Sequence, residues 1–391
     1  MGGFQYIKKS KLRGGLLGKI DAPLNKMLQN VEWGEYRLGD LFDVDSWVYG
    51  KNKKYFTELK YSTSKSISVV SGITENNGIN YYTEDKLSED EIFESELTIT
   101  TRGEYSGTVF YHPEKFVLAN NILVMIIPNW SKNHKIFIGS IINSLSYGGY
   151  SGYPRKETLA NDLILLPTRK GEIDFEFMDK FISELEAQRI SELEAYLLVT
   201  NLKDYSLTEE EKHALKEFES IVWENYYYKD IFNHIVQGRR LTKEDQLPGN
   251  IPFVMSGTTN TGVVNYISNP VASFPGNSIT VDIFGNAFYR NYYFGAGDDT
   301  GVYWNDRIVY SKETMLFFTT SMSKSLLGKY SYGKKLRSSQ SLNFKMQLPS
   351  CNKQPNYSIM ETIISAIQKL VIKDVVEYVD RKIETTKEVC K

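Results

Sequence analysis

The sequence predicts an α+β fold: two similar, mainly-β globules separated by two long helices that pack as an antiparallel coiled coil. Two observations support this fold class. A set of short motifs occurs twice in the same order, and each occurrence is followed by a long stretch without Gly or Pro in which apolar residues recur at helical spacing. An internal repeat constrains the architecture first, because each copy is then one structural unit.

Four pairs of segments carry the repeat. Each copy opens on Trp and reaches Asp, an aliphatic residue and Phe at the same spacing, and each closes on an apolar run that ends in Pro. The pairs are 33–42 with 223–232, 69–72 with 253–257, 147–156 with 330–337, and 163–167 with 344–349. Four repeated motifs in the same order indicate a duplicated domain.

Within each copy the pattern is that of short strands and turns. Residues alternate with a period of two at 95–100, and 108–111 and 278–284 are rich in β-branched and aromatic residues, as half-buried strands are. The segments Asn76–Gly78 and Asn260–Gly262 are predicted turns. Short helices are expected around 136–145 and 312–327.

The period changes to three and four residues in 172–202 and 357–389, which predicts two long helices. At 1.5 Å per residue, roughly 30 residues make a rod of about 45 Å, too long to bury its apolar stripe against one small globule. Packing of the two rods as a coiled coil solves this problem, and the alternative is that each helix lies on its own globule. In the connector 203–218, Thr208 to Glu211 has the pattern of a capping box.

These patterns divide the chain into five expected segments. They are a basic N-terminal extension (1–30), a first globule (31–170), a first long helix with its connector (171–219), a second globule (220–355) and a second long helix (356–391).

Composition limits the class of protein. Two cysteines, Cys351 and Cys390, are too few for a disulfide framework or a Cys-based zinc site and are typical of a reducing cytoplasm. The sequence contains no apolar run of the length that a membrane helix needs, so we expect a cytoplasmic protein that does not bind membranes. The net charge is −2, so a nucleic-acid binder of this composition would need local basic loops.

The sequence contains no recognisable catalytic motif. No Pro-Pro pair occurs, which excludes the Asn/Asp/Ser-Pro-Pro-aromatic box of amino-methyltransferases, and no Walker A phosphate loop is present. The four His residues are scattered and none has metal-ligand spacing. We therefore predict no catalytic residue, no metal and no cofactor in this chain.

Both globules have predicted loops in which basic, amide and aromatic residues are mixed. Arg, Lys, Asn and Gln read base edges, and Lys and Arg also hold phosphates. For any one of these residues taken singly, a solvated loop side chain is the simpler explanation. The DNA-binding candidates of the first globule are Lys51, Lys53, Lys54, Asn76, Asn77, Arg102, Tyr105, Tyr153 and Arg155. Those of the second are Arg239, Arg240, Asn260, Arg290, Tyr292, Lys334, Lys335, Arg337 and Gln340.

This order of globule, helix, globule and helix resembles the specificity (S) subunit of type I restriction-modification systems, and the S subunit of type IIB systems is closely similar. Three sets of residues carry the resemblance, which covers about 31–391. They are Glu-Tyr-Arg-Leu-Gly-Asp-Leu-Phe at 35–42 with its degenerate copy at 226–232, the stretch Ser71–Gly78, and the stretch Ser256–Gly262.

The resemblance implies a non-catalytic subunit in which each globule is a target recognition domain that reads one half of a bipartite site in double-stranded DNA. It implies that the helices set the spacing and dock two DNA methyltransferase (modification) subunits, which bind S-adenosylmethionine, and that a restriction subunit can join the complex. The alternative from another class is a tandem β-rich module that binds a carbohydrate or protein ligand and oligomerises through a helical stalk.

Overall fold

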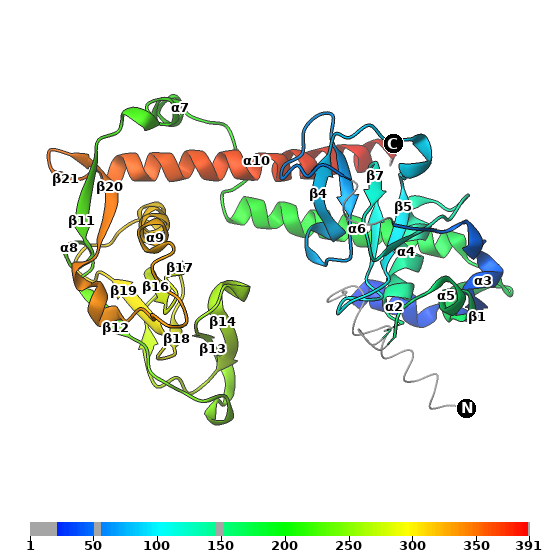
Figure 1. The fold of residues 1–391 in the computed structure, drawn as a ribbon, viewed down its shortest axis with the longest axis horizontal. Helices are drawn as coiled ribbons and strands as arrows, with labels where there is room; N and C mark the ends of the chain where they lie inside the picture. Colours follow the sequence, from blue (N-terminus) through cyan, green and yellow to red (C-terminus); the bar gives the residue numbers. More distant parts are fainter. Residues whose placement is uncertain (1–21, 51–55, 146, 148–151, 390–391) are drawn as a thin grey trace. The chain divides into compact units, whose positions relative to one another are not determined.

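The chain forms two compact units, Met1–Glu192 (the first unit) and Leu193–Lys391 (the second unit) (Figure 1). The computed structural model describes residues 22–50, 56–145, 147 and 152–389. Among these residues, no helix is both long enough and apolar enough to span a lipid bilayer.

The described part of the first unit has a short helix before its three small sheets and a long helix after them. Its elements are α2 (Ala22–Asn30), β1 (Glu32–Arg37), α3 (Leu38–Leu41), β2 (Val48–Tyr49), β3 (Ile67–Val70), β4 (Ile79–Thr83), β5 (Glu96–Thr100), β6 (Val109–His112), β7 (Phe116–Leu118), β8 (Ile122–Met125), α4 (Lys132–Asn143), α5 (Lys156–Asn161), β9 (Leu163–Arg169), β10 (Glu172–Ile173) and α6 (Phe175–Val199), whose last turns belong to the second unit.

The second unit repeats this order of elements, with one additional short strand and a 3₁₀ helix (Ser338–Asn343) in the place of α5. Its elements are α7 (Glu209–Lys216), β11 (Trp223–Tyr227), α8 (Tyr228–Ile231), β12 (His234–Gln237), β13 (Pro248–Val254), β14 (Val263–Ile267), β15 (Ser273–Phe274), β16 (Ser278–Asp282), β17 (Ala287–Arg290), β18 (Phe294–Ala296), β19 (Thr300–Trp304), α9 (Lys312–Leu326), β20 (Lys345–Cys351), β21 (Gln354–Pro355) and α10 (Tyr357–Val389).

The sheet topology confirms the duplication. The four-stranded sheet β2-β8-β5-β6 of the first unit has its copy in β12-β19-β16-β17 of the second, and β4-β3-β7 has its copy in β14-β13-β18-β15. In both units one pair of strands is parallel, β3 with β7 and β13 with β18, among antiparallel neighbours. The opening motif of each repeat forms the strand that pairs with the closing Pro-ended strand, β1 with β9 and β11 with β20.

Equivalent glycines keep the backbone paths alike. Gly50 donates to the carbonyl of Ile122 and Gly238 to that of Thr300, both at 2.9 Å. A Cβ atom on Gly50 would lie 1.7 Å from the Ala119 carbonyl oxygen, and one on Gly238 would lie 2.2 Å from that of Gly297. No larger residue fits at either position without moving the backbone.

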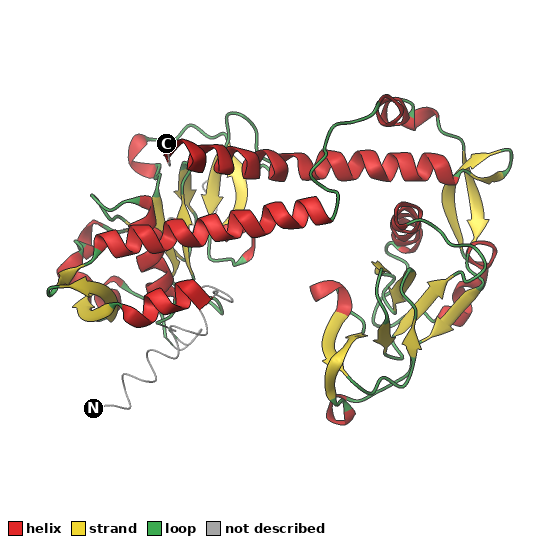
Figure 2. Ribbon diagram, turned by 180° about the vertical axis from the view of Figure 1, so that it is seen from behind, coloured by secondary structure: helices red, strands yellow, loops and turns green. Residues whose placement is uncertain are grey.

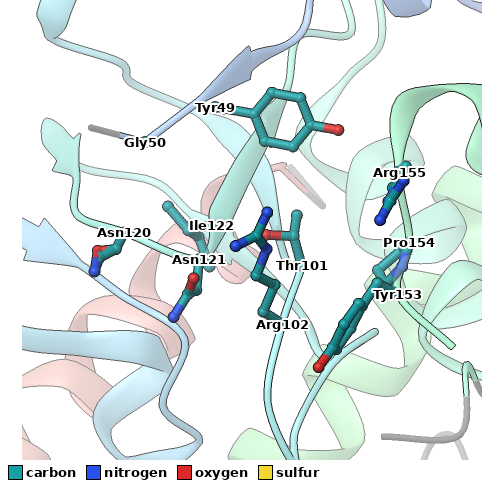
Figure 3. Close-up of a pocket in the computed structure, with 10 residues that line it drawn as sticks. All are labelled: Tyr49, Gly50, Thr101, Arg102, Asn120, Asn121, Ile122, Tyr153, Pro154 and Arg155. Atoms are coloured by element: carbon teal, nitrogen blue, oxygen red, sulfur yellow. The ribbon is translucent and has the colours of Figure 1, made fainter. Parts of the chain in front are cut away.

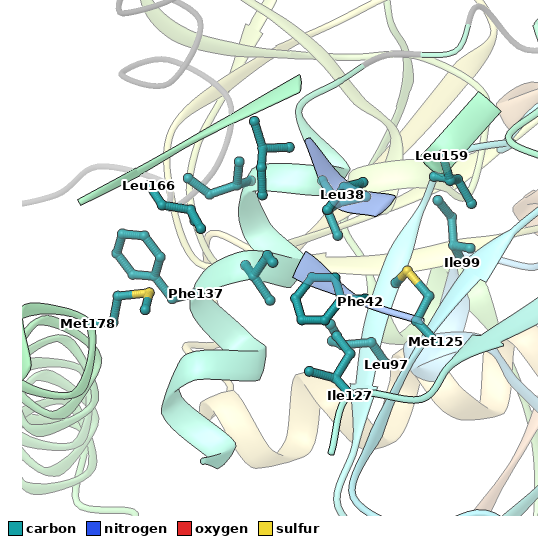
Figure 4. Close-up of a cluster of buried hydrophobic side chains, with 14 of the residues drawn as sticks. Leu38, Phe42, Leu97, Ile99, Met125, Ile127, Phe137, Leu159, Leu166 and Met178 are labelled. Atoms are coloured by element: carbon teal, nitrogen blue, oxygen red, sulfur yellow. The ribbon is translucent and has the colours of Figure 1, made fainter. Parts of the chain in front are cut away.

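Each unit has its own hydrophobic core between the four-stranded sheet and its helices. In the first unit, Leu97, Ile99 and Met125 from the sheet share a buried cluster with Phe137 of α4 and Met178 of α6 (Figure 4). The second unit has an equivalent cluster between β16, β19, α9 and the start of α10. The other face of the four-stranded sheet is buried as well, against the smaller sheet of its unit.

The two long helices are confirmed. α6 has 25 residues and α10 has 33, and both contrast with the short strands in the view coloured by secondary structure (Figure 2). The beginning of each helix packs on the core of its own unit, through Phe181 and Ile182 in α6 and through Met360 and Ile363 in α10. The expected coiled coil between the two helices stays a prediction.

The connector forms the predicted capping box and is fastened to α10. The Thr208 hydroxyl accepts from the Glu211 amide at the start of α7. The buried Glu211 carboxylate accepts from Ser365 Oγ at 2.6 Å and from Lys369 Nζ at 2.9 Å. Burial raises the pKa of Glu211, but these hydrogen bonds outweigh it and the pKa is lowered.

Candidate nucleic-acid interface

A polar pocket of about 490 Å³ lies in the first unit at one end of the sheet β2-β8-β5-β6. Its walls come from the end of β2, the segment after β5, the β7–β8 turn and the segment that leads into α5. They are Tyr49, Gly50, Thr101, Arg102, Asn120, Asn121, Ile122, Tyr153, Pro154 and Arg155. We call this site the first-unit pocket. The Arg102 side chain stands in its middle, with the two asparagines on one side and Tyr153 and Arg155 on the other (Figure 3).

Backbone and side-chain hydrogen bonds hold the pocket walls. The Thr101 amide donates to the Asn121 carbonyl at 2.8 Å, and the Lys156 amide donates to the Tyr49 hydroxyl at 3.1 Å. Thr101 and Pro154 are buried, whereas the Arg102 and Arg155 side chains are exposed. No carboxylate lines the pocket, and within the described chain no ion pair neutralises either guanidinium. The pocket is therefore rich in hydrogen-bond donors.

The second unit carries different side chains at the equivalent positions. The strand registers align Tyr49 with Gln237. Tyr49 lies on β2, which pairs with β8 and through it with β5, and Gln237 has the same position on β12, which pairs with β19 and through it with β16. Following the same chain path, Arg102 aligns with Phe284, Asn120 with Asp298 and Arg155 with Arg337. Here the Asp298 carbonyl accepts from Arg337 Nη1 at 2.6 Å and from Gln237 Nε2 at 3.0 Å. Arg337, the counterpart of Arg155, thus donates to a carbonyl of its own unit.

The predicted Asn-rich turns are confirmed and have nearly identical backbones. Asn76 and Asn77 have φ values of 47° and 52°, and Asn260 and Thr261 have the same values. The left-handed region suits asparagine but is strained for the β-branched Thr261. All three asparagine candidates are exposed at the surface of these turns.

The prediction that Arg290 lies in an exposed loop is wrong. Arg290 is in strand β17 with 1 % of its surface exposed. It donates from Nε to Thr280 Oγ1 at 3.1 Å, and from Nη1 to Thr261 Oγ1 at 2.8 Å and to the Tyr292 hydroxyl at 3.1 Å. Its Nη2 donates to the Thr261 carbonyl. Burial lowers the pKa of Arg290, and its hydrogen bonds hold the strained turn; the side chain is not presented to a ligand.

A basic and aromatic turn follows α9 in the second unit. Lys335 Nζ lies 4.7 Å from the ring centroid of Tyr332, and Lys334 Nζ lies 5.9 Å from that of Tyr330. Both lysines are exposed, and so is the Tyr332 ring. Gln340 accepts from the Arg337 amide at 3.1 Å, which places this candidate beside the turn as a cap.

The other candidates are not gathered at one place. Tyr105 is exposed in the β5–β6 connection, Arg239 and Arg240 are exposed after β12, and Tyr292 is exposed beyond β17. Lys51, Lys53 and Lys54 lie outside the described residues.

Sequence reasoning named only Arg102, Tyr153 and Arg155 among the residues of the first-unit pocket, and the polar residues that it missed include Tyr49, Asn120 and Asn121. Tyr49 looked like part of a strand, and the pair Asn120 and Asn121 separates two apolar runs. Asn121 has a φ of 64°, so the Asn-Asn pair between strand patterns was the signal that could have revealed this turn. In the second unit Gln237 and Asp298 were missed, because their contacts join segments that are far apart in the sequence.

The described residues contain no cluster of three or more His, Cys, Asp or Glu side chains that could hold a metal ion. The site offers donors, amides and aromatic faces, so it is built for binding a polar ligand such as a base edge or phosphate.

Comparison with known proteins gives matches over nearly the whole chain. The family model described as type I restriction modification DNA specificity domain matches twice, at residues 30–195 and 221–378. The specificity subunit S.BcgI of a type II restriction enzyme from Heyndrickxia coagulans is 25% identical over 355 residues, which are 88% of this chain and 96% of that protein. The crystal structure of a type I restriction-modification S subunit from M. genitalium superposes with a TM-score of 0.52 at 14% identity, with 96% of each chain covered.

Proposed function

The chain belongs to the type I restriction-modification DNA specificity family, and on that premise we propose that it reads a bipartite target in double-stranded DNA, one half-site with each unit. Specificity subunits of this family are non-catalytic, so the chemistry is left to other subunits. We further propose that 31–170 and 220–355 are the two target recognition domains and that 171–219 and 356–391 are the spacer segments.

The observation that carries this proposal is the pairing of one scaffold with two sets of side chains. Both units have the same sheet order, yet the pocket positions Tyr49, Arg102 and Asn120 are matched by Gln237, Phe284 and Asp298. A duplicated scaffold that differs at its polar loop positions is what reading two different half-sites requires, because base edges differ in their donor and acceptor patterns.

The long helices support a role in docking DNA methyltransferase subunits, which would be two in number and would bind S-adenosylmethionine. Within the second unit, α10 leaves Ile367, Leu370 and Val371 exposed, and apolar side chains gathered on one helix favour a protein partner. A restriction subunit would join the same complex. Helices of 25 and 33 residues would also give the two domains a defined separation on DNA.

The test is methylome sequencing of a host that expresses this chain with its methyltransferase partner, against a control that lacks only this chain. We expect a split adenine-methylation motif that is absent from the control. Replacing 220–355 with the corresponding domain of a relative should change one half-site, and inserting residues into α6 should change only the spacer.

An unchanged methylome in the presence of an active partner would contradict the proposal. A change in both half-sites on exchange of 220–355 would contradict the assignment of one half-site to each domain. The alternative of a carbohydrate- or protein-binding module has no support in the family match.

A further inference from the structure

We propose that the first-unit pocket binds the edge of a guanine in the DNA major groove and that Arg102 is the residue that reads it. The inference rests on the proposed function and goes beyond it by naming the base, the residue and the unit. It follows from the donors that line the pocket, from the way they are held and from the different side chains at the equivalent positions of the second unit.

The chemistry of the lining favours guanine among the four bases. Guanine presents two acceptors in the major groove, N7 and O6, whereas adenine presents an acceptor beside an amino donor. An arginine has donors only, in a fork that fits two adjacent acceptors. Arg102 is exposed in the middle of the pocket, and Arg155 stands at its side (Figure 3).

The position of Arg102 favours a base contact over a phosphate contact. Its neighbour Thr101 is buried and tied to the β7–β8 turn through the Asn121 carbonyl, so the base of the Arg102 side chain is fixed at the sheet end. Asn120 and Asn121 form the wall on the other side of Arg102 from Tyr153 and Arg155 (Figure 3). A mixed, walled site of this kind suits a planar base edge, whereas a phosphate needs only exposed positive charge.

The second unit shows the contrast. Phe284 takes the place of Arg102, and the Asp298 carbonyl is occupied by Arg337 and Gln237. The acidic pair Asp298 and Asp299 replaces the asparagine pair. A guanine edge would meet no counterpart of the Arg102 guanidinium there, so we expect the two half-sites to differ in the base read from this position.

The test uses the complex of the whole chain with its methyltransferase partner and duplexes that carry the motif methylated by the wild-type complex. Arg102→Lys keeps the charge and removes the fork. We expect it to lower discrimination at one guanine of one half-site by roughly ten- to a hundred-fold, with the other half-site and the salt dependence of binding unchanged. Replacing that guanine by 7-deazaguanine, which lacks the N7 acceptor, should weaken binding of the wild type and leave the variant unaffected.

Lys115→Ala is the matched control. Lys115 is exposed in the β6–β7 turn, which follows His112. Because His112 pairs with Glu96 at the start of β5, this turn lies at the opposite end of the sheet from Thr100 and Arg102. The control should leave the motif unchanged.

Three outcomes would overturn the inference. The first is that Arg102→Lys leaves the methylated motif and its base discrimination unchanged. The second is that the position at which Arg102→Lys loses discrimination is an adenine. The third is that Arg102→Ala lowers the affinity for all duplexes uniformly and makes the salt dependence shallower, which indicates a phosphate contact. In each case the wild type still methylates a split motif, so the proposed function stands. A wild-type complex without any split motif would instead remove the premise.

Discussion

At the same place in equivalent sheets, the first unit buries His112 and the second unit buries Arg290. Each is bonded to the equivalent threonine, His112 Nε2 to Thr98 Oγ1 at 2.9 Å and Arg290 Nε to Thr280 Oγ1 at 3.1 Å. Only the arginine is long enough to reach the neighbouring left-handed turn as well. The comparison teaches that strand pairing preserves the scaffold, while a single buried polar position changes which other segment is held in place.

The left-handed turns of the two units differ in one residue. The first unit has Asn77 where the second has Thr261, at the same φ of 52°. Asparagine tolerates this conformation and a β-branched residue does not, so the second unit needs the hydrogen bonds from Arg290 and the first unit does not need them from His112.

Removal of Arg290 has the largest expected effect. Arg290→Ala leaves the Thr261 carbonyl and the Thr280 hydroxyl without their donor, so we expect it to destabilise the second unit by about 2–4 kcal/mol. Adding Thr261→Asn should recover about 1 kcal/mol, because asparagine relieves the left-handed strain. Urea unfolding with hydrogen exchange of the β16–β17 peptides measures both. Equal stability of Arg290→Ala and the wild type would show that the turn does not depend on the arginine.

Acidification should produce a smaller difference in stability between the two units. Burial lowers the pKa of His112 from 6.5 to about 4, so between these values the unfolded chain binds a proton that the folded unit does not. The stability of the first unit should therefore fall by about 2 kcal/mol from pH 7 to pH 5. Arg290 stays charged over this range and contributes no such change in the second unit.

The variant His112→Gln isolates this contribution, because it keeps a neutral side chain that can bond Thr98. Hydrogen exchange of the β5–β6 peptides at pH 7 and pH 5 compares it with the wild type. The same loss of protection in both proteins would assign the acid sensitivity to other groups.

The smallest expected difference is between two serines that follow β3 and β13. Ser256 Oγ donates to Asp282 at 3.2 Å, whereas Ser71 Oγ, which lies one position earlier in the repeat, is buried without a hydrogen-bond partner. Ser256→Ala should cost about 1 kcal/mol, and Ser71→Ala should be neutral or slightly stabilising. Denaturation midpoints of the two variants give the comparison, and a reversed order would contradict it.

The sequence foretold the elements whose signals are local. The period-two runs became strands β5 and β16, the three- and four-residue spacing became α6 and α10, and the Asn-Gly segments became left-handed turns. Residue spacing and turn chemistry act over a few positions, so they can be recognised without the fold. The expected placement of Arg290 failed because a basic residue in a strand looks the same as one in a loop when its partners are unknown.

The sequence by itself determined the duplication, the two long helices, the class of the chain and most of the exposed candidate residues. Only the tertiary structure decided which of them meet: that Arg102 and Arg155 share a pocket with Tyr49, and that Arg337 closes onto Asp298. These contacts join segments 53 to 106 residues apart in the first unit and 39 apart in the second. The physical reason is that strand register and loop closure bring them together, and neither leaves a pattern in the sequence around any one of these residues.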